Sequence, residues 1–400
     1  MFKLKATLIA MSLVTASILY SSQAMAGAKL EIDETKWISI GIGTRVSFTS
    51  IENPAPDKGR SEDLYLDSAR IYLNGQIHEY IKFEINTECV FCNNTALRDF
   101  EILDAVAKFE FNSMFNIWAG RVLVPADRAE ASGPYYANTY DFNKTPLYPT
   151  DFSIRFGTGG AGVYNRDHGA TLWGAVYESR LQYAFGVYDG LESSSTLGPN
   201  QDDSPLFATR IAYNFLNVEK NPGYYGSSTY FGKAGDIFTI GFAAQLHDNG
   251  VGTITNPGDF FGMSVDLLFE KVLANNAVFT VEAEYKNFDS DFNTAAYTDG
   301  GPCFCMFDGD AWTATALYLF PKKIVWGQFQ PYVRYTENNP DASAERNEFE
   351  VGLNYIIDGH NARIAAFYQT GDIATKGLNY APTATGESVD AFKVGLQLQF

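Results

Sequence analysis

Apolar and polar residues alternate with a period of two along most of the chain. In residues 37–48, isoleucine, valine and phenylalanine on one parity alternate with serine, glycine and arginine on the other. Residues 387–400 repeat the alternation up to the terminal Phe400. Because successive side chains of a strand point to opposite faces, each such segment predicts a β-strand with one apolar and one polar face.

About sixteen segments of this kind follow one another. Short turns mostly alternate with longer loops between them, and an even strand number closes an antiparallel barrel with both chain ends on one side. The predicted fold is therefore all-β, a closed antiparallel transmembrane β-barrel. The predicted strands are residues 37–48, 64–76, 79–87, 100–112, 115–125, 168–177, 181–190, 205–214, 237–247, 259–270, 277–287, 310–320, 328–337, 345–356, 361–371 and 387–400.

One connection departs from this rule. Residues 215–236, which are rich in Gly, Asn, Pro and Tyr, fall where a short turn is expected. The predicted number of strands could therefore differ by one hairpin at this connection.

A membrane gives the alternation a physical reason. In the hydrocarbon core every backbone N–H and C=O must pair within the protein, and only a closed sheet has no unpaired edge. A secreted β-sandwich or adhesin is the soluble alternative. Its strands would also alternate, but their apolar faces would fill a packed core.

The composition agrees with a strand protein. The 400 residues include 35 Gly, 31 Phe and 24 Tyr, and only 19% are charged, which disfavours a helical bundle. There are 47 Asp and Glu against 29 Lys and Arg, a net charge of −18, and no basic cluster. Because neutralising phosphates requires concentrated positive charge, nucleic acid is excluded as a partner.

The N-terminus has the pattern of a bacterial secretory signal. Two lysines precede an apolar run over residues 6–20, and Ala24-Met25-Ala26 forms a small-x-small cleavage pattern. We expect residues 1–26 to be removed, which leaves 27–400 as the barrel domain with a charge of 27 − 47 = −20. A retained anchor is the alternative.

The rest of the chain predicts the cellular location. No later segment reaches the roughly 18 consecutive apolar residues of a membrane helix. The last strand, which ends in Phe400, resembles the closing strand of bacterial outer-membrane barrels. The predicted location is therefore the bacterial outer membrane, with its lipid as a partner.

Four segments carry recognisable strand motifs, namely Ser68–Gly75, Trp118–Pro125, Arg166–Gly169 and Tyr183–Gly190. They resemble the Arg-x-x-x-x-Gly, Gly-x-x-x-x-Pro, Arg-x-x-Gly and Tyr-x-x-Gly-x-x-x-Gly segments of the phosphate-selective porin O/P family. The resemblance covers roughly residues 64–190 and resumes weakly at the C-terminus. It implies a homotrimeric porin that passes small hydrophilic solutes or ions.

The resemblance also implies a role for the longest connection, from Ala126 to Asp167. In sixteen-stranded porins the third outer loop folds into the lumen and narrows it, and this connection has the same place in the order. A solvated lid or a trimer contact is the alternative. The charged and aromatic residues available for a constriction are Asp127, Arg128, Glu130, Tyr135, Tyr136, Asp141, Lys144, Arg155 and Arg166.

The polar strand faces would line the lumen with charges of both signs. Basic candidates for the pore lining and constriction are Arg45, Arg70, Lys82, Lys108, Arg128, Lys144, Arg155, Arg166, Arg210, Arg334 and Lys393; strand parity adds Lys286. Acidic residues on the same faces are Glu84, Asp104, Glu110, Asp266, Glu282, Glu284, Glu348 and Glu350.

These charges nearly cancel. Strongly anion-selective members of the family line their channels with arginine ladders and a lysine cluster, and often have a basic residue where this chain has Leu123. We therefore predict a general or weakly selective pore. For each charged residue, the alternative is a wall salt bridge that never contacts a solute.

The four cysteines, Cys89, Cys92, Cys303 and Cys305, fall in two predicted outer loops. In an oxidising compartment they predict two disulfides, with three connectivities open. A site for zinc or an iron–sulfur cluster is the alternative. Neither pair is followed by His, so covalent haem has no support, and no cofactor is predicted.

No catalytic motif appears in the sequence. The four histidines are scattered over turns and strand ends, without a His-Glu-x-x-His or Gly-x-Ser-x-Gly pattern, so we predict no enzyme activity. The predicted function is passive diffusion of small solutes through a water-filled lumen. The alternative is a structural sheath or anchor that docks a partner protein at the outer membrane.

Overall fold

A computed structural model of the chain describes residues 27–53, 59–90, 92, 99–142, 144–148, 165–291, 303–305, 307–378 and 380–400. In these residues the chain forms 17 strands of one sheet and two short helices, α1 (Arg128–Tyr136) and α2 (Ile373–Lys376). The strands are β1 (Ala28–Glu31), β2 (Trp37–Ile51), β3 (Ser61–His78), β4 (Ile81–Val90), β5 (Asp99–Glu110), β6 (Asn116–Leu123), β7 (Arg166–Val176), β8 (Leu181–Tyr188), β9 (Leu206–Asn214), β10 (Ile237–Gly252), β11 (Pro257–Val272), β12 (Val278–Ser290), β13 (Gly309–Leu319), β14 (Gln328–Pro340), β15 (Arg346–Asp358), β16 (Ala362–Gly371) and β17 (Val389–Gln399). The expected signal segment 1–26 lies outside the described residues.

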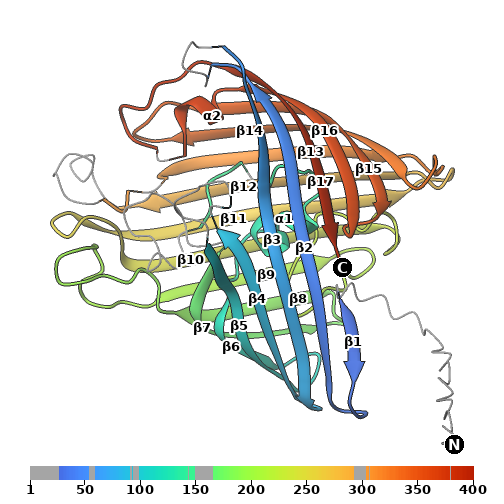
Figure 1. Ribbon diagram of the computed structural model, residues 1–400. Helices are drawn as coiled ribbons and strands as arrows, with labels where there is room; N and C mark the ends of the chain where they lie inside the picture. The colour runs from blue at the N-terminus through green and yellow to red at the C-terminus, as the bar shows by residue number, and fades with distance from the viewer. Residues whose placement is uncertain are drawn as a thin grey trace, which may run out of the picture.

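Strands β2 to β17 form a closed antiparallel ring (Figure 1). Each strand pairs with its neighbours in the sequence, as β2 does with β3 and β9 with β10. The ring closes where β17 pairs with β2, between Ala391–Gln399 and Gly43–Ile51. The predicted closed antiparallel barrel of about sixteen strands is confirmed.

β1 is an additional strand that the alternation did not predict. Its four residues pair with Trp37–Ile40 at the start of β2. On their other edge, the same β2 residues pair with β3. β1 therefore lies on the edge of β2 that pairs with β17 further along, and it comes after the end of β17. Four exposed residues are too few to show a period of two, which is why the sequence did not reveal this strand.

The apolar faces of the strands point outward from the barrel. On β2, Ile40 and Ile42 are 55% and 57% exposed, while Ser39 is 3% exposed. A soluble β-sandwich would bury the isoleucines and expose the serine, so the soluble alternative is wrong. This orientation suits a barrel surrounded by lipid. No helix among the described residues is long and apolar enough to cross a membrane.

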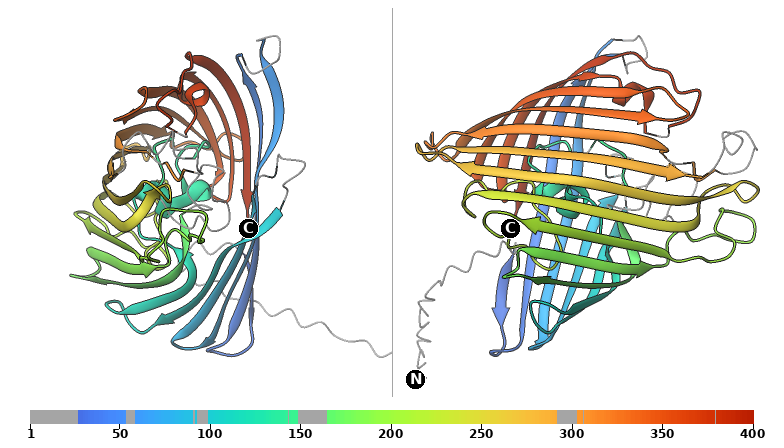
Figure 2. Two further views of the ribbon diagram at one scale, coloured as in Figure 1. Left: turned by 90° about the vertical axis from the view of Figure 1, so that its left-hand side faces the viewer. Right: turned by 180° about the vertical axis from the view of Figure 1, so that it is seen from behind.

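The connections divide between two rims. On one rim the strands are joined by short turns, such as 79–80 and 359–361, and both ends of the barrel chain lie there. The opposite rim carries the longer connections, and residues 124–165 between β6 and β7, named L3 below, are the longest of these. The beginning of L3 forms α1, which lies inside the barrel (Figure 2). The predicted folding of the third loop into the lumen is confirmed for its described residues 124–142 and 144–148.

The connection 215–236 is on the rim of the short turns, at the point where the sequence did not decide whether the strand count includes one more hairpin. β9 and β10 pair directly, with Asn214 opposite Thr239, so no hairpin is missing from the count. The chain instead makes one long excursion between two adjacent strands. Several of its side chains are buried inside the barrel, including Glu219, which is 4% exposed.

Candidate functional site

The candidate site is the lumen where L3 crosses it, and it begins at the start of α1. Asp127 caps the helix, since its carboxylate accepts a hydrogen bond of 2.9 Å from the Glu130 amide. The Nζ atom of Lys286 on β12 lies 2.6 Å from Asp127 and 3.3 Å from Glu130. Burial would raise the pKa of Asp127, but the Lys286 ammonium holds it below its usual value. The first turn of α1 is thereby joined to the barrel wall.

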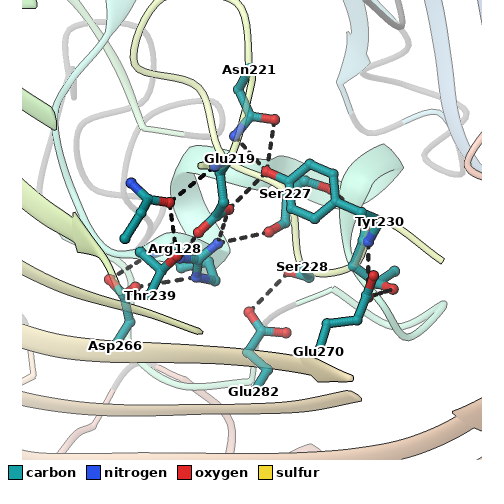
Figure 3. A network of polar contacts seen from close by, with 12 residues as sticks. Arg128, Glu219, Asn221, Ser227, Ser228, Tyr230, Thr239, Asp266, Glu270 and Glu282 are labelled. Atoms are coloured by element: carbon teal, nitrogen blue, oxygen red, sulfur yellow. Dashed lines mark hydrogen bonds and ion pairs between the residues drawn. The ribbon is translucent and has the colours of Figure 1, made fainter. Parts of the chain in front are cut away.

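Arg128, the first residue of α1, joins three parts of the chain (Figure 3). Its two terminal nitrogens each donate to Glu219 over 2.8 Å, and its Nε lies 3.2 Å from Asp266 on β11. Asp266 also accepts two hydrogen bonds from Arg210 on β9, of 2.5 and 2.9 Å. Bidentate geometry of this kind makes an arginine–carboxylate pair strong and directional.

Arginines of the barrel wall hold the backbone of L3. A guanidinium has five donors and no acceptor, so it can bind carbonyl oxygens that a helix end or loop leaves unpaired. Four wall arginines do this from four different strands. The hydrogen bonds run from Arg45 to the Tyr140 oxygen, from Arg210 to the Ala126 oxygen (2.9 Å), from Arg334 to the Asp141 oxygen (2.8 Å) and from Arg363 to the Ala137 oxygen (2.7 Å).

Glycines of the wall make room for the tyrosines of L3. The Tyr140 ring lies against Gly395 on β17, where an added Cβ would be 2.5 Å from ring carbons. Tyr135 lies in the same way on Gly43 of β2, and Tyr148 on Gly262 of β11, with corresponding distances of 2.8 and 2.7 Å. L3 is therefore fixed by shape as well as by hydrogen bonds.

The remaining predicted pore residues form ion pairs with acidic neighbours. Three pairs join wall residues to each other: Arg70 with Glu88, Lys82 with Glu110, and Lys108 with Glu84. Arg166, at the start of β7, lies 2.7 Å from Asp104 on β5. Arg155 lies outside the described residues.

Asp141 of L3 collects a second set of charges. Its carboxylate is 2.7 Å from Lys393 on β17 and 3.4 Å from Lys144. The side chains of Lys393 and Lys144 are 17% and 21% exposed, so this cluster is partly accessible. Burial would raise the pKa of Asp141, but the two lysines hold it well below its usual value.

Two features of the lumen were missed at the sequence level. Arg363 is fully buried and binds the backbone of L3, although the parity of strand 361–371 could have placed it inside. The segment 215–236 enters the lumen, and its length was the only signal in the sequence.

The cysteines pair within each motif. Cys89 is joined to Cys92, and Cys303 to Cys305. Phe304 is 5% exposed and packs in an apolar cluster with Tyr148 of L3 and Phe260 of β11. The second disulfide thus lies where an outer loop meets L3. Among the described residues, no group of three or more His, Cys, Asp or Glu could hold a metal ion.

One serine and one histidine meet inside the barrel. His360 Nε2 is 3.2 Å from Ser227 Oγ and 3.0 Å from the Thr229 carbonyl oxygen. The Ser227 hydroxyl itself donates to that same oxygen over 2.9 Å. A ring nitrogen that donates to Thr229 cannot accept the serine proton, and burial lowers the pKa of His360 to about 3. The pair is arranged to join segments rather than to activate a nucleophile.

Solved structures with the same architecture are bacterial outer-membrane proteins. An anion-selective porin from Comamonas acidovorans is 13% identical with a TM-score of 0.56, and the match covers 91% of this chain and 100% of that one. The chain has the fold of the outer-membrane porins.

Two further structures agree with this fold. Salmonella typhi OmpF, solved with daunomycin, is 12% identical with a TM-score of 0.54, over 93% of this chain and 100% of that one. The channel DcaP of Acinetobacter baumannii is 10% identical with a TM-score of 0.54, over 94% and 100%. No protein-family model matches the sequence, and no curated protein is similar to it at the sequence level. The porin fold is therefore recognised from the structure.

Proposed function

We propose that the protein is a channel of the bacterial outer membrane through which small hydrophilic solutes and ions diffuse passively. The observation that carries this proposal is L3, which lies inside a closed barrel and is bound to its wall by arginines from four strands. A loop held in this way narrows a lumen permanently. An apolar outer face and a charged interior are what a water-filled pore in lipid requires.

The pore is general or weakly selective in this proposal. With the exception of Arg45, which holds the Tyr140 carbonyl oxygen, the described basic residues of the predicted lining lie beside carboxylates, as Lys393 does beside Asp141. Paired charges produce little net field for attracting anions. The resemblance to the phosphate-selective porin O/P family stays a prediction, and we do not expect phosphate to be selected.

The proposal includes a homotrimer in contact with outer-membrane lipid, without cofactor or catalytic activity. The in-vitro folded outer-membrane protein OmpT of Vibrio cholerae was solved in a trimer form, and it is 12% identical with a TM-score of 0.52 over 92% of this chain and 100% of that one. The outward apolar residues offer the surface that lipid or a second subunit would cover. Chemical cross-linking in native membranes tests the trimer directly.

Planar-bilayer recording of the purified protein tests the channel. We expect discrete conductance steps from samples whose folded state is verified by heat-modifiable electrophoretic mobility. Folded protein that inserts but produces no steps would contradict the proposal.

A sheath or anchor that docks a partner protein is the second candidate. The observation in its favour is that segments from both rims, L3 and residues 215–236, enter the lumen. A plugged sheath would insert without conducting, so the same recording separates the two candidates.

A further inference from the structure

The connection between β9 and β10, residues 215–236, is called the bar below. On the same rim, residues 321–326 form a turn in which every residue is exposed. In the bar, by contrast, Ser227, Ser228 and Thr229 are only 3%, 2% and 0% exposed. The bar therefore enters the barrel from the rim opposite to that of L3.

The bar contacts opposite walls of the barrel. The Tyr225 hydroxyl donates to Glu84 on β4 over 3.0 Å, and the Ser228 hydroxyl donates to Glu282 on β12 over 2.9 Å. β4 and β12 are eight strands apart in a closed ring of sixteen, since 12 − 4 = 8. Four consecutive residues of the bar therefore span the lumen from wall to wall.

The middle of the bar is attached to α1 by its backbone. The Gly226 amide donates to the Ala131 oxygen over 2.9 Å, and the Ser228 amide donates to the Tyr136 oxygen over 3.0 Å. Gly226 approaches so closely that an added Cβ would lie 3.2 Å from the Ala131 Cβ. The Glu219–Arg128 pair, with two hydrogen bonds of 2.8 Å, adds a charged contact (Figure 3).

The far side of the bar is held by a wall carboxylate. Glu270 on β11 is fully buried and accepts hydrogen bonds from the Thr229 hydroxyl (2.7 Å), the Tyr230 amide (3.0 Å) and the Gly232 amide (2.7 Å). A buried carboxylate without donors is costly, so the wall favours the bar in this position. The bar is thus part of the folded barrel.

We infer that the bar and α1 together form the narrowest section of the channel, so that the size limit for solutes is set by a segment from the short-turn rim as well as by L3. This inference rests on the proposed channel function. A solute has to pass beside a strut that contacts opposite walls, which leaves only part of the barrel cross-section for conduction.

Replacing the bar by a short turn tests this inference. The β9–β10 ladder continues past the strand ends, because the Phe215 amide donates to the Phe238 oxygen (2.8 Å) and the Asn217 amide to the Asp236 oxygen (3.1 Å). Residues 218–235 can therefore be exchanged for Asn-Gly, a two-residue hairpin turn. The matched control exchanges the exposed turn 321–326 on the same rim for Asn-Gly. Heat-modifiable mobility verifies that both variants fold.

We expect the shortened variant to conduct at least about twofold more per channel than the wild type, because its lumen is wider, while the control is unchanged. Equal conductance of wild type and shortened variant would overturn the inference that the bar narrows the channel, and would leave the proposed channel function standing. A wild type that does not conduct, together with a shortened variant that does, would support the inference about the bar and contradict the proposal that the wild-type channel is open. If both proteins fold and remain silent, both proposals fail.

A disulfide tests the position of the bar independently of conductance. Ala131→Cys with Gly226→Cys would place the two Cβ atoms near the separation of about 3.5–4.5 Å that a disulfide needs. We expect nearly complete cross-linking of the folded barrel, and little with the control pair Ala131→Cys and Glu178→Cys, whose second site is in an exposed turn. Equal cross-linking of the two pairs would overturn the placement.

Discussion

Arg363 and Ala137 are joined by a hydrogen bond of 2.7 Å that links the wall strand β16 to the residue that follows α1. The same guanidinium donates to the Thr139 oxygen over 3.1 Å and to the side chain of Gln397 over 3.0 Å. One fully buried arginine therefore holds the loop at the point where the helix ends.

Arg363→Met should loosen L3. The carbonyl oxygens of Ala137 and Thr139 would lose their partner, and each buried unsatisfied group costs about 1–3 kcal/mol. We expect a lower temperature for loss of the folded band on unboiled electrophoresis, together with noisier channel current. Arg60→Met is the control, because Arg60 is on the rim of the longer connections and its side chain is 42% exposed. Equal effects of the two substitutions would contradict a specific role for Arg363.

Gly395→Val should displace Tyr140. An added Cβ would lie 2.5 Å from the ring, so the tyrosine would leave the Asp67 carboxylate, to which it now donates over 2.6 Å. Overpacking of this kind costs about 1–3 kcal/mol. A double-mutant cycle with Tyr140→Ala is the measurement: thermal stability should fall much less when Gly395→Val is made in a background without the ring. Additive losses would show that the contact does not matter.

Lys393 and Asp141 should shift ion selectivity in opposite directions. Lys393→Gln leaves the Asp141 carboxylate with less compensation and should move the zero-current potential toward cation preference. Asp141→Asn leaves Lys393 without its carboxylate partner and Lys144 with Glu348 alone, at 3.5 Å, and should move it toward anions. The wild type should lie near zero in a salt gradient. Shifts of the same sign, or strong anion preference of the wild type, would contradict this assignment.

The bar should stay attached to L3 except at acidic pH. Burial would raise the pKa of Glu219, but the Arg128 guanidinium holds it below the usual 4.5. Because the pKa of Glu219 is lower in the folded state, its pairing with Arg128 contributes its full stabilisation above the usual pKa of 4.5. This stabilisation is lost as the pH falls through the folded-state pKa. The protection of residues 218–233 from hydrogen exchange, taken relative to the unfolded peptide at the same pH, should remain high at neutral pH and fall only below 4.5. In Glu219→Gln the acid-induced loss of protection should be smaller, with Glu178→Gln, in an exposed turn, as the control.

The two disulfides should each lie within one tryptic peptide. Cys89 and Cys92 fall between Lys82 and Arg98, and Cys303 and Cys305 between Lys286 and Lys322. Non-reducing peptide mapping should therefore show no cross-linked peptides, and reduction should make all four thiols available for alkylation. A peptide pair joined between the two loops would contradict the connectivity.

The barrel could be predicted from local patterns because its physical cause is local. In β2 the alternation of Ile40 and Ile42 with Ser39 states which face each side chain occupies, since the period of a strand is two. The lipid then requires closure, because no edge can remain unpaired. The entry of the third loop into the lumen came from a family resemblance, and its sequence alone left a lid or a trimer contact open.

What the lumen charges do was decided only by the tertiary structure. Strand parity placed Arg45 and Arg334 inside, but a guanidinium binds a solute, a carboxylate or a carbonyl oxygen according to what the fold brings near it. Here it brings the L3 backbone. The Glu219–Arg128 contact spans 91 positions of the sequence and joins segments that enter from opposite rims. Such contacts follow from packing at long range, which a pattern of period two does not encode.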